Sequence, residues 1–142
     1  MATNLLRISD AASLGLHAMA LLGKDEAEDG WVSAARLAGE LKVSEAHLAK
    51  VMRRLGRGGL VRSARGRGGG FRLARPAGDV RLLEIYEAIE GPLDPAECLM
   101  DPPICGGRRC VMGRLVRSVN RQVRDRLAET TLKELAEAFA PR

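Results

Sequence analysis

Residues 44–75 read SEAHLAKVMRRLGRGGLVRSARGRGGGFRLAR, and this stretch decides the fold. Ser44 is placed to cap a helix over residues 45–55, because the apolar side chains of that segment recur on a single face. Two short segments, residues 60–65 and 71–73, then flank a glycine-rich run. This run predicts a β-hairpin whose tip needs backbone angles that glycine adopts most readily.

The segment upstream completes the pattern. The mostly apolar residues 8–22 predict a buried helix, and Ser33 is placed to cap a further helix over residues 34–41. A short turn joins that helix to the one at 45–55. The order helix, tight turn, helix, glycine-tipped hairpin predicts a winged helix-turn-helix, a mainly α fold with a small β-hairpin wing. In such a fold the second helix enters the major groove of DNA, and the wing reaches the backbone or the minor groove.

The segment downstream predicts three more helices. Residues 81–90 form the first, which Gly91 ends. Between residues 112 and 127 apolar side chains recur at three- and four-residue steps, which indicates one long amphipathic helix. Thr131 and Glu134 have the spacing of a capping box and open a short last helix.

The charge distribution points to nucleic acid. The chain of 142 residues carries a net charge of +5, and the stretch from Ala46 to Gly78 holds nine Lys or Arg and no acidic residue. A solvated basic face is the alternative, but the absence of acids together with the fold order favours double-stranded DNA. Aromatic residues make up 3% of the chain, which disfavours recognition of single strands by stacking. The residues expected to contact DNA are Ser44, Ala46, His47, Lys50, Arg53, Arg54, Arg57, Arg62, Arg65, Arg67, Gly68 and Gly69.

All three cysteines of the chain lie within thirteen residues, in a loop rich in proline and glycine. Cys98, Cys105 and Cys110 have the spacing Cys-x6-Cys-x4-Cys. Thiolates that converge on one point hold an iron–sulfur cluster or a soft cation, so the loop is a candidate metal centre. A Cys3His or Cys3Asp zinc site uses the same residues and is the rival chemistry. Burial of the cysteines as small apolar residues fits less well, because they lie outside any periodic core pattern.

The fourth ligand of this centre is open, and the first helix holds two candidates for it. His17 and Asp10 share one polar stripe there, with His17 the first candidate and Asp10 the second. Arg108 and Arg109 precede Cys110, and their charge would favour thiolates.

Several short runs resemble the iron–sulfur-responsive winged-helix transcription regulators, the IscR/NsrR family, also called the Rrf2 family. These runs are VSxxHL at 43–48, GLVxSxRGxGGGF at 59–71, AIEG at 88–91 and TTLxxL at 130–135. The resemblance implies a homodimeric bacterial regulator in which the long helix after the cysteines dimerises. It further implies a [2Fe–2S] or [4Fe–4S] cluster held by the three cysteines and one further ligand, with cluster state setting DNA affinity.

The chain also departs from the family pattern. Well-known members space their cysteines by five and five residues, and some use a histidine at the position of Gly113. Ala49 stands where the cluster regulators carry a glutamate, so a DNA sequence preference is not transferred.

The sequence therefore predicts three segments. Residues 1–82 form the winged helix-turn-helix, residues 83–110 a helix with the cluster-binding loop, and residues 111–142 the dimerisation helix and the C-terminal helix. We expect a cytoplasmic DNA-binding regulator, with repression favoured, that reads a palindromic operator as a homodimer, senses nitric oxide, redox or iron status and makes no membrane contact. A zinc-binding or cluster-free winged-helix regulator and a metal or redox protein that does not act through DNA are the alternatives. An enzyme with a cysteine nucleophile is not expected, because no base with an orienting partner is evident.

Overall fold

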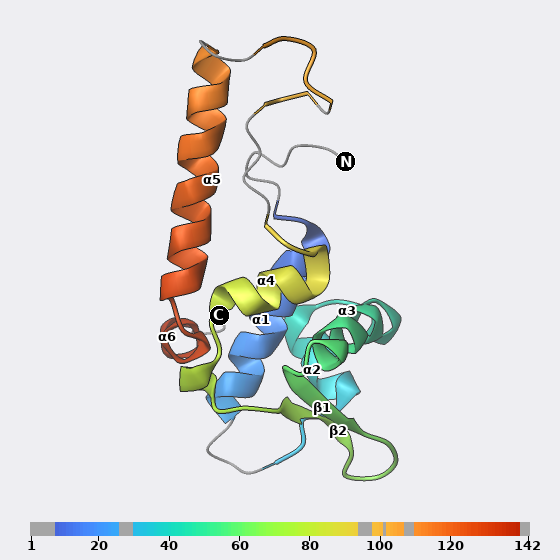
Figure 1. The fold of residues 1–142 in the computed structure, drawn as a ribbon. Helices are drawn as coiled ribbons and strands as arrows, with labels where there is room; N and C mark the ends of the chain where they lie inside the picture. Colours follow the sequence, from blue (N-terminus) through green and yellow to red (C-terminus); the bar gives the residue numbers. More distant parts are fainter. Residues whose placement is uncertain (1–7, 26–29, 94–97, 101, 107–109, 140–142) are drawn as a thin grey trace.

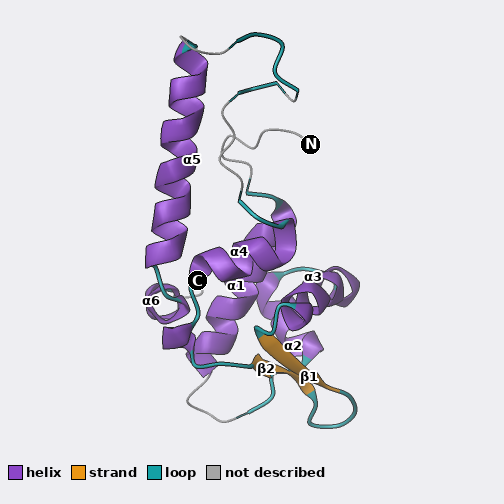
Figure 2. Ribbon diagram, viewed as in Figure 1, coloured by secondary structure: helices purple, strands orange, loops and turns teal. Residues whose placement is uncertain are grey.

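The computed structural model describes residues 8–25, 30–93, 98–100, 102–106 and 110–139. Within them the chain forms a mainly helical structure with one two-stranded hairpin, as the sequence predicts (Figure 1, Figure 2). The hairpin projects from one end of the molecule, and the long helix α5 stands at the opposite side (Figure 1).

Three capped helices build the first part of the fold. Helix α1 spans Asp10–Lys24, α2 spans Ala34–Leu41 and α3 spans Glu45–Arg57. The hydroxyls of Ser33 and Ser44 accept backbone N–H bonds of 3.2 and 3.1 Å, which confirms both predicted caps. The hydroxyl of a further serine, Ser9, caps α1 in the same way.

Helix α3 is two residues longer than the sequence indicated. The prediction ended it at Leu55, before the glycines, whereas the helix continues to Arg57. The N–H of Gly58 still bonds to the carbonyl of Arg54 at 3.1 Å, so Gly56 is accommodated within the helix rather than ending it.

The wing is a short antiparallel hairpin of β1, Val61–Ala64, and β2, Gly70–Leu73. Its register pairs Val61 with Leu73 and Ala64 with Gly70. On its other side β2 is tied to the segment before α2, because Phe71 and Val32 exchange backbone hydrogen bonds of 2.8 and 2.9 Å. The predicted unusual backbone angles occur at Gly66, Gly68 and Gly70, with φ of 87°, 74° and 142°.

Gly70 is expected to tolerate no side chain. A Cβ at this position would overlap the carbonyl group of Val32, and the φ of 142° is one that L side chains rarely adopt. We expect Gly70→Ala to lower the free energy of unfolding by about 2–4 kcal/mol in a urea titration. Gly39→Ala is the matched control, because Gly39 lies within α2 with open space around it. It should raise stability by about 0.5–1 kcal/mol. Equal effects of the two substitutions would contradict the strained geometry of the wing.

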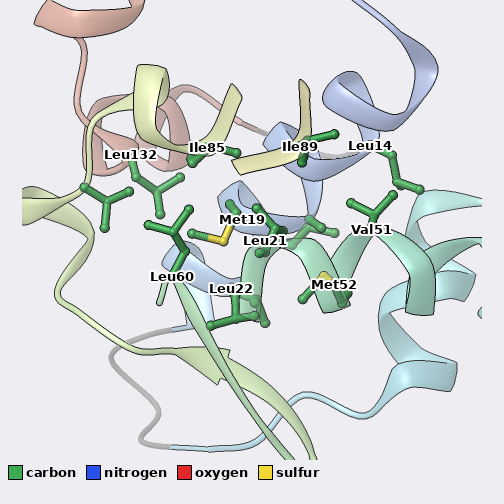
Figure 3. Packing of buried hydrophobic residues seen from close by; sticks show 14 of the residues in the cluster. Leu14, Met19, Leu21, Leu22, Val51, Met52, Leu60, Ile85, Ile89 and Leu132 are labelled. Atoms are coloured by element: carbon green, nitrogen blue, oxygen red, sulfur yellow. The ribbon is translucent and has the colours of Figure 1, made fainter. Parts of the chain in front are cut away.

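The core is assembled around α1. Figure 3 shows side chains of α1, α3, α4 and α6 meeting in one cluster beside Leu60, which precedes the wing. Met19, Leu48, Ile85 and Leu132 are each fully buried. Residues from all three predicted segments of the chain therefore share a single hydrophobic core.

The second half of the chain returns to this core. Helix α4 spans Leu82–Glu90 after the short 3-10 turn η2 at Ala77–Asp79, and α5, Val111–Glu129, leads into α6, Leu132–Ala138. Backbone bonds tie the start of α4 to the α5–α6 junction: the N–H of Leu82 donates to Thr130 at 3.0 Å, and that of Leu132 to Val80 at 2.8 Å. The predicted capping box of Thr131 and Glu134 is present.

Candidate DNA interface and cysteine loop

The recognition helix α3 divides into two faces. Leu48, Val51, Met52 and Leu55 are buried in the core. On the outer side the expected DNA-contact residues of this helix are exposed, namely Ala46, His47, Lys50, Arg53, Arg54 and Arg57. Within the same stretch Ser44 has a structural role as the cap of α3, since its hydroxyl holds the N–H of His47.

A groove runs between α3 and the wing. It has a volume of about 500 Å3 and is lined by Ala49, Met52, Arg53, Gly56, Arg57, Val61, Ser63 and Phe71. Residues of α3, among them Arg53 and Arg57, thus form one wall, and residues of the two strands form the other. The two arginines in the lining make the groove basic, which suits an anionic partner such as nucleic acid. Ala49 and Ser63 belong to this groove but were absent from the residues expected to contact DNA.

The wing places its arginines at the tip and on one side of the hairpin. Arg65 and Arg67 are exposed at the tip. Arg62 and Arg72 are direct cross-strand partners, so their side chains leave the same face. The guanidinium of Arg72 lies 4.6 Å from the ring centroid of Trp31. Sequence reasoning did not select Arg72 as a contact, although the two-residue alternation of the strands would have paired it with Arg62.

The backbone geometry of the turn explains why glycines stand at the wing tip. Gly68 has a positive φ of 74°, and a Cβ at Gly69 would overlap the carbonyl of Ala64. Both were expected to contact DNA, and the structure shows that the geometry of the turn favours glycine at both positions.

Two further basic residues of the acid-free stretch, besides Arg72, are engaged within the protein. Arg75 forms an ion pair of 2.6 Å with Glu84, in the first turn of α4. Partial burial raises the pKa of Glu84, but the backbone N–H of Arg81 and the Arg75 guanidinium outweigh this effect and hold the pKa below its usual value. Arg54 donates from Nη1 to the carbonyl of Ile89 at 3.1 Å.

The cysteine loop connects α4 to α5, on the side of the molecule away from the wing (Figure 1). All three thiols are free, with Cys105 exposed and the other two half-buried. Cys110 is the N-cap of α5, where its sulfur accepts the N–H of Gly113 at 3.3 Å, and Cys98 accepts the N–H of Met100 at 3.4 Å. Among the residues that the structure describes, no three His, Cys, Asp or Glu side chains lie close enough to hold a metal ion, so the expected convergence of thiols is not seen there. Arg108 and Arg109 lie outside the described residues.

The two candidate fourth ligands occupy different parts of α1. Asp10 is exposed in its first turn, next to Ser9, whose hydroxyl bonds to Glu90 where the cysteine loop leaves α4. His17 lies farther along the helix, with Nδ1 2.7 Å from the carbonyl of Ser13 and its ring edge-to-face with Phe139. A carbonyl oxygen can only accept, so Nδ1 carries the proton and Nε2 is the nitrogen that remains for a ligand. Within the described residues, neither candidate belongs to a group of three or more side chains that could hold a metal ion.

The helix-turn-helix, the exposed basic face of α3 and the hairpin wing together define a winged-helix DNA-binding protein. A model of the Rrf2 family, described as iron-dependent transcriptional regulator, matches residues 8–138. The chain belongs to this family of transcriptional regulators, as its sequence motifs indicated.

Individual relatives agree with this placement. An HTH-type transcriptional regulator of Neisseria meningitidis is 30% identical over 132 residues, which cover 93% of this chain and 88% of the relative. CymR, the global cysteine regulator of B. subtilis, has a similar structure with a TM-score of 0.81 and 30% identity, over 96% of this chain and 100% of that chain. IscR of T. potens has a TM-score of 0.73 and 27% identity, over 95% of this chain and 90% of that chain. In the described part of the chain, no helix combines the length and the apolar character needed to cross a bilayer.

Proposed function

We propose that this regulator binds a palindromic operator as a homodimer, and that an iron–sulfur cluster held by Cys98, Cys105 and Cys110 controls its affinity for DNA. The observation that carries the proposal is the position of the cysteine loop. It joins the helix that packs against the recognition helix to the long helix whose first turns expose apolar side chains. A structural change in the loop therefore occurs next to the two parts of the molecule that operator binding uses, namely the region that supports α3 and the start of α5. Repression in the cytoplasm is the mode of action that we favour.

The chemistry of the donor set fits a cluster. Three free thiols within thirteen residues supply soft ligands, and Cys110 stands at the N-terminal end of α5, where the helix dipole favours negative charge. Asp10 or His17, from this chain or from a second copy, would supply the fourth ligand. When bound, the cluster supplies redox and nitric-oxide chemistry at the loop. Zinc held by the same thiols is the rival occupant.

The apolar start of α5 supports the homodimer. Val111, Met112 and Leu115 are 73%, 43% and 47% exposed, in contrast to Val116 and Leu127, which are buried. A second copy of the same helix covers such a face with a matching one through a two-fold contact. Two recognition helices related in this way read half-sites about one helical turn apart.

The DNA part of the proposal is tested with Arg53 and Arg67. Because Arg53 lines the groove on α3, Arg53→Gln should cost about 1–3 kcal/mol of operator binding and relax preference at one base position. Arg67 lies at the wing tip, so Arg67→Gln should weaken binding more evenly across sequences or reduce preference for narrow-groove flanks. Titrations over an operator library at two salt concentrations measure both effects.

Arg121→Gln provides the matched control, because it removes the same charge from an exposed position on α5. Its affinity and salt dependence should stay within error of the parent. If the Arg53 and Arg67 variants also bind every sequence as tightly as the parent, the assignment of α3 and the wing to DNA is wrong. A chain that binds a cluster without binding DNA would favour the redox-protein alternative.

A further inference from the structure

The last turn of α4 is held by two other helices at the point where the cysteine loop begins. The carbonyl of Ile89 accepts the hydrogen bond from Nη1 of Arg54, on the recognition helix. The side chain of the next residue, Glu90, accepts the bond from the hydroxyl of Ser9, at the start of α1. Gly91 then turns the chain away with a φ of 84°. The loop that carries the cysteines is therefore rooted on a fixed helix end.

Close packing reinforces these two bonds. A Cβ on Gly15 of α1 would overlap Cδ1 of Ile89, so the two helices meet through a glycine. A Cβ on Gly58, the C-cap of α3, would lie 3.1 Å from Cβ of Ala88. Interiors packed in this way transmit displacement rather than absorb it. A shift of the last turn of α4 must move α3 or break the Arg54 contact.

Arg54 differs in this respect from its neighbours on the recognition helix. Arg53 lines the groove beside the wing, whereas the guanidinium of Arg54 crosses to a helix thirty-five positions farther along the chain. The carbonyls at a helix C-terminus lack intrahelical partners and carry partial negative charge, which a cation stabilises. Arg54 thus has a specific structural partner at the root of the cysteine loop.

We propose that Arg54 is a positioning residue that couples the cysteine loop to the recognition helix, rather than a contact to DNA. The inference rests on the proposed function, in which the loop changes with the state of its iron–sulfur cluster. A structural change in the loop shifts Gly91 and with it the carbonyl of Ile89. The hydrogen bond from Arg54 transmits that shift to α3. Linkage makes the coupling reciprocal, so operator binding must restrain the end of α4.

The test compares Arg54→Gln and Arg54→Lys with Arg53→Gln, the variant of the neighbouring arginine that lines the groove. All are made in the full-length protein, and circular dichroism checks that each variant folds. The first readout is the salt dependence of operator binding. Removal of one phosphate contact lowers the slope of log K against log salt by about one. We expect Arg54→Gln to keep the slope of the parent. A slope reduced by about one would mark Arg54 as a DNA contact and overturn the proposal.

The second readout is hydrogen exchange at residues 88–91 of the cluster-free protein, with and without operator DNA. In the parent, operator should slow exchange there, including the Gly91 amide that bonds to Glu87. In Arg54→Gln this protection should be lost, and in Arg54→Lys it should be partly restored because lysine can still donate to the carbonyl. The same protection in the parent and in Arg54→Gln, or none in the parent, would overturn the coupling.

The third readout is the ratio of operator affinities with and without the cluster, which should move toward one in Arg54→Gln. An unchanged ratio in that variant would also overturn the proposal. If the parent itself shows no cluster and no such ratio, the sensing function fails. In that case the exchange measurement alone decides whether Arg54 couples α4 to α3.

Discussion

Leu115→Glu should convert the protein to a monomer and weaken operator binding on the order of 100-fold or more. Leu115 lies in the exposed apolar face of α5 with Val111 and Met112. Burial of an unpaired carboxylate in a contact between two copies costs several kcal/mol, so the dimer dissociates. A monomer then loses the high effective concentration that the second half-site provides. Sedimentation velocity measures the first effect, and titration of a palindromic operator measures the second.

Ala128→Glu is the control for this experiment. It adds the same charge at another exposed position of α5, away from the apolar face, and should leave both the sedimentation coefficient and operator affinity close to those of the parent. The affinity of either variant for DNA that contains an isolated half-site should differ little from that of the parent. A Leu115→Glu protein that sediments like a parent dimer would show that α5 does not provide the interface through this face.

Cys110→Ser should remove most of the iron and sulfide from the anaerobically purified protein, together with the brown colour that we expect of the parent. Serine is a weak ligand for iron compared with a thiolate, but it is a good helix N-cap. The cap that Cys110 provides to Gly113 is therefore retained, and the variant should fold like the parent. Absorption spectra and assays for iron and acid-labile sulfide measure the loss.

Zinc analysis of the same preparations separates the two occupants of the cysteine loop. If the parent is colourless, holds stoichiometric zinc and takes up no cluster on reconstitution, the cysteine loop is a zinc site and not a cluster site. Parent and Cys110→Ser proteins with equal iron and sulfide would exclude Cys110 as a ligand. If operator affinity changes with the cluster in the parent but not in Cys110→Ser, the result supports control of DNA binding by the loop.

Local chemistry explains why so much of the fold was predictable from the sequence. Ser33 and Ser44 cap helices because a serine hydroxyl satisfies N–H groups one turn away. Gly66, Gly68 and Gly70 take positive φ because glycine, which has no Cβ, adopts these angles at the lowest cost. These interactions span a few residues, so the order of elements and the winged-helix class were predicted from neighbouring positions alone. The end of α3 was misplaced because a glycine can remain in a helix when its flanking bonds hold.

The sequence predicted which types of residue form the candidate site, but not how those residues are arranged in space. The sequence indicated the basic face of α3 and the cysteine loop, since both depend on residue types in short stretches. Arg53 and Arg54 were both among the expected DNA contacts, although one lines the groove and the other bonds to Ile89. That Ala49 and Ser63 line one groove could not be predicted, because a groove between a helix and a strand is formed by residues distant in sequence.

The amphipathic pattern of residues 112–127 gives the clearest division between the two levels. The three- and four-residue repeat determined that one long helix forms, with a continuous apolar stripe. The tertiary structure decided that Val116 and Leu127 of this stripe are buried, with Leu127 in the core, while Met112 and Leu115 remain exposed. The same division holds for His17, whose contact with Phe139 depends on α6 folding back onto α1. Periodicity along a helix records which side chains share a face, whereas the surface that covers each of them depends on long-range packing.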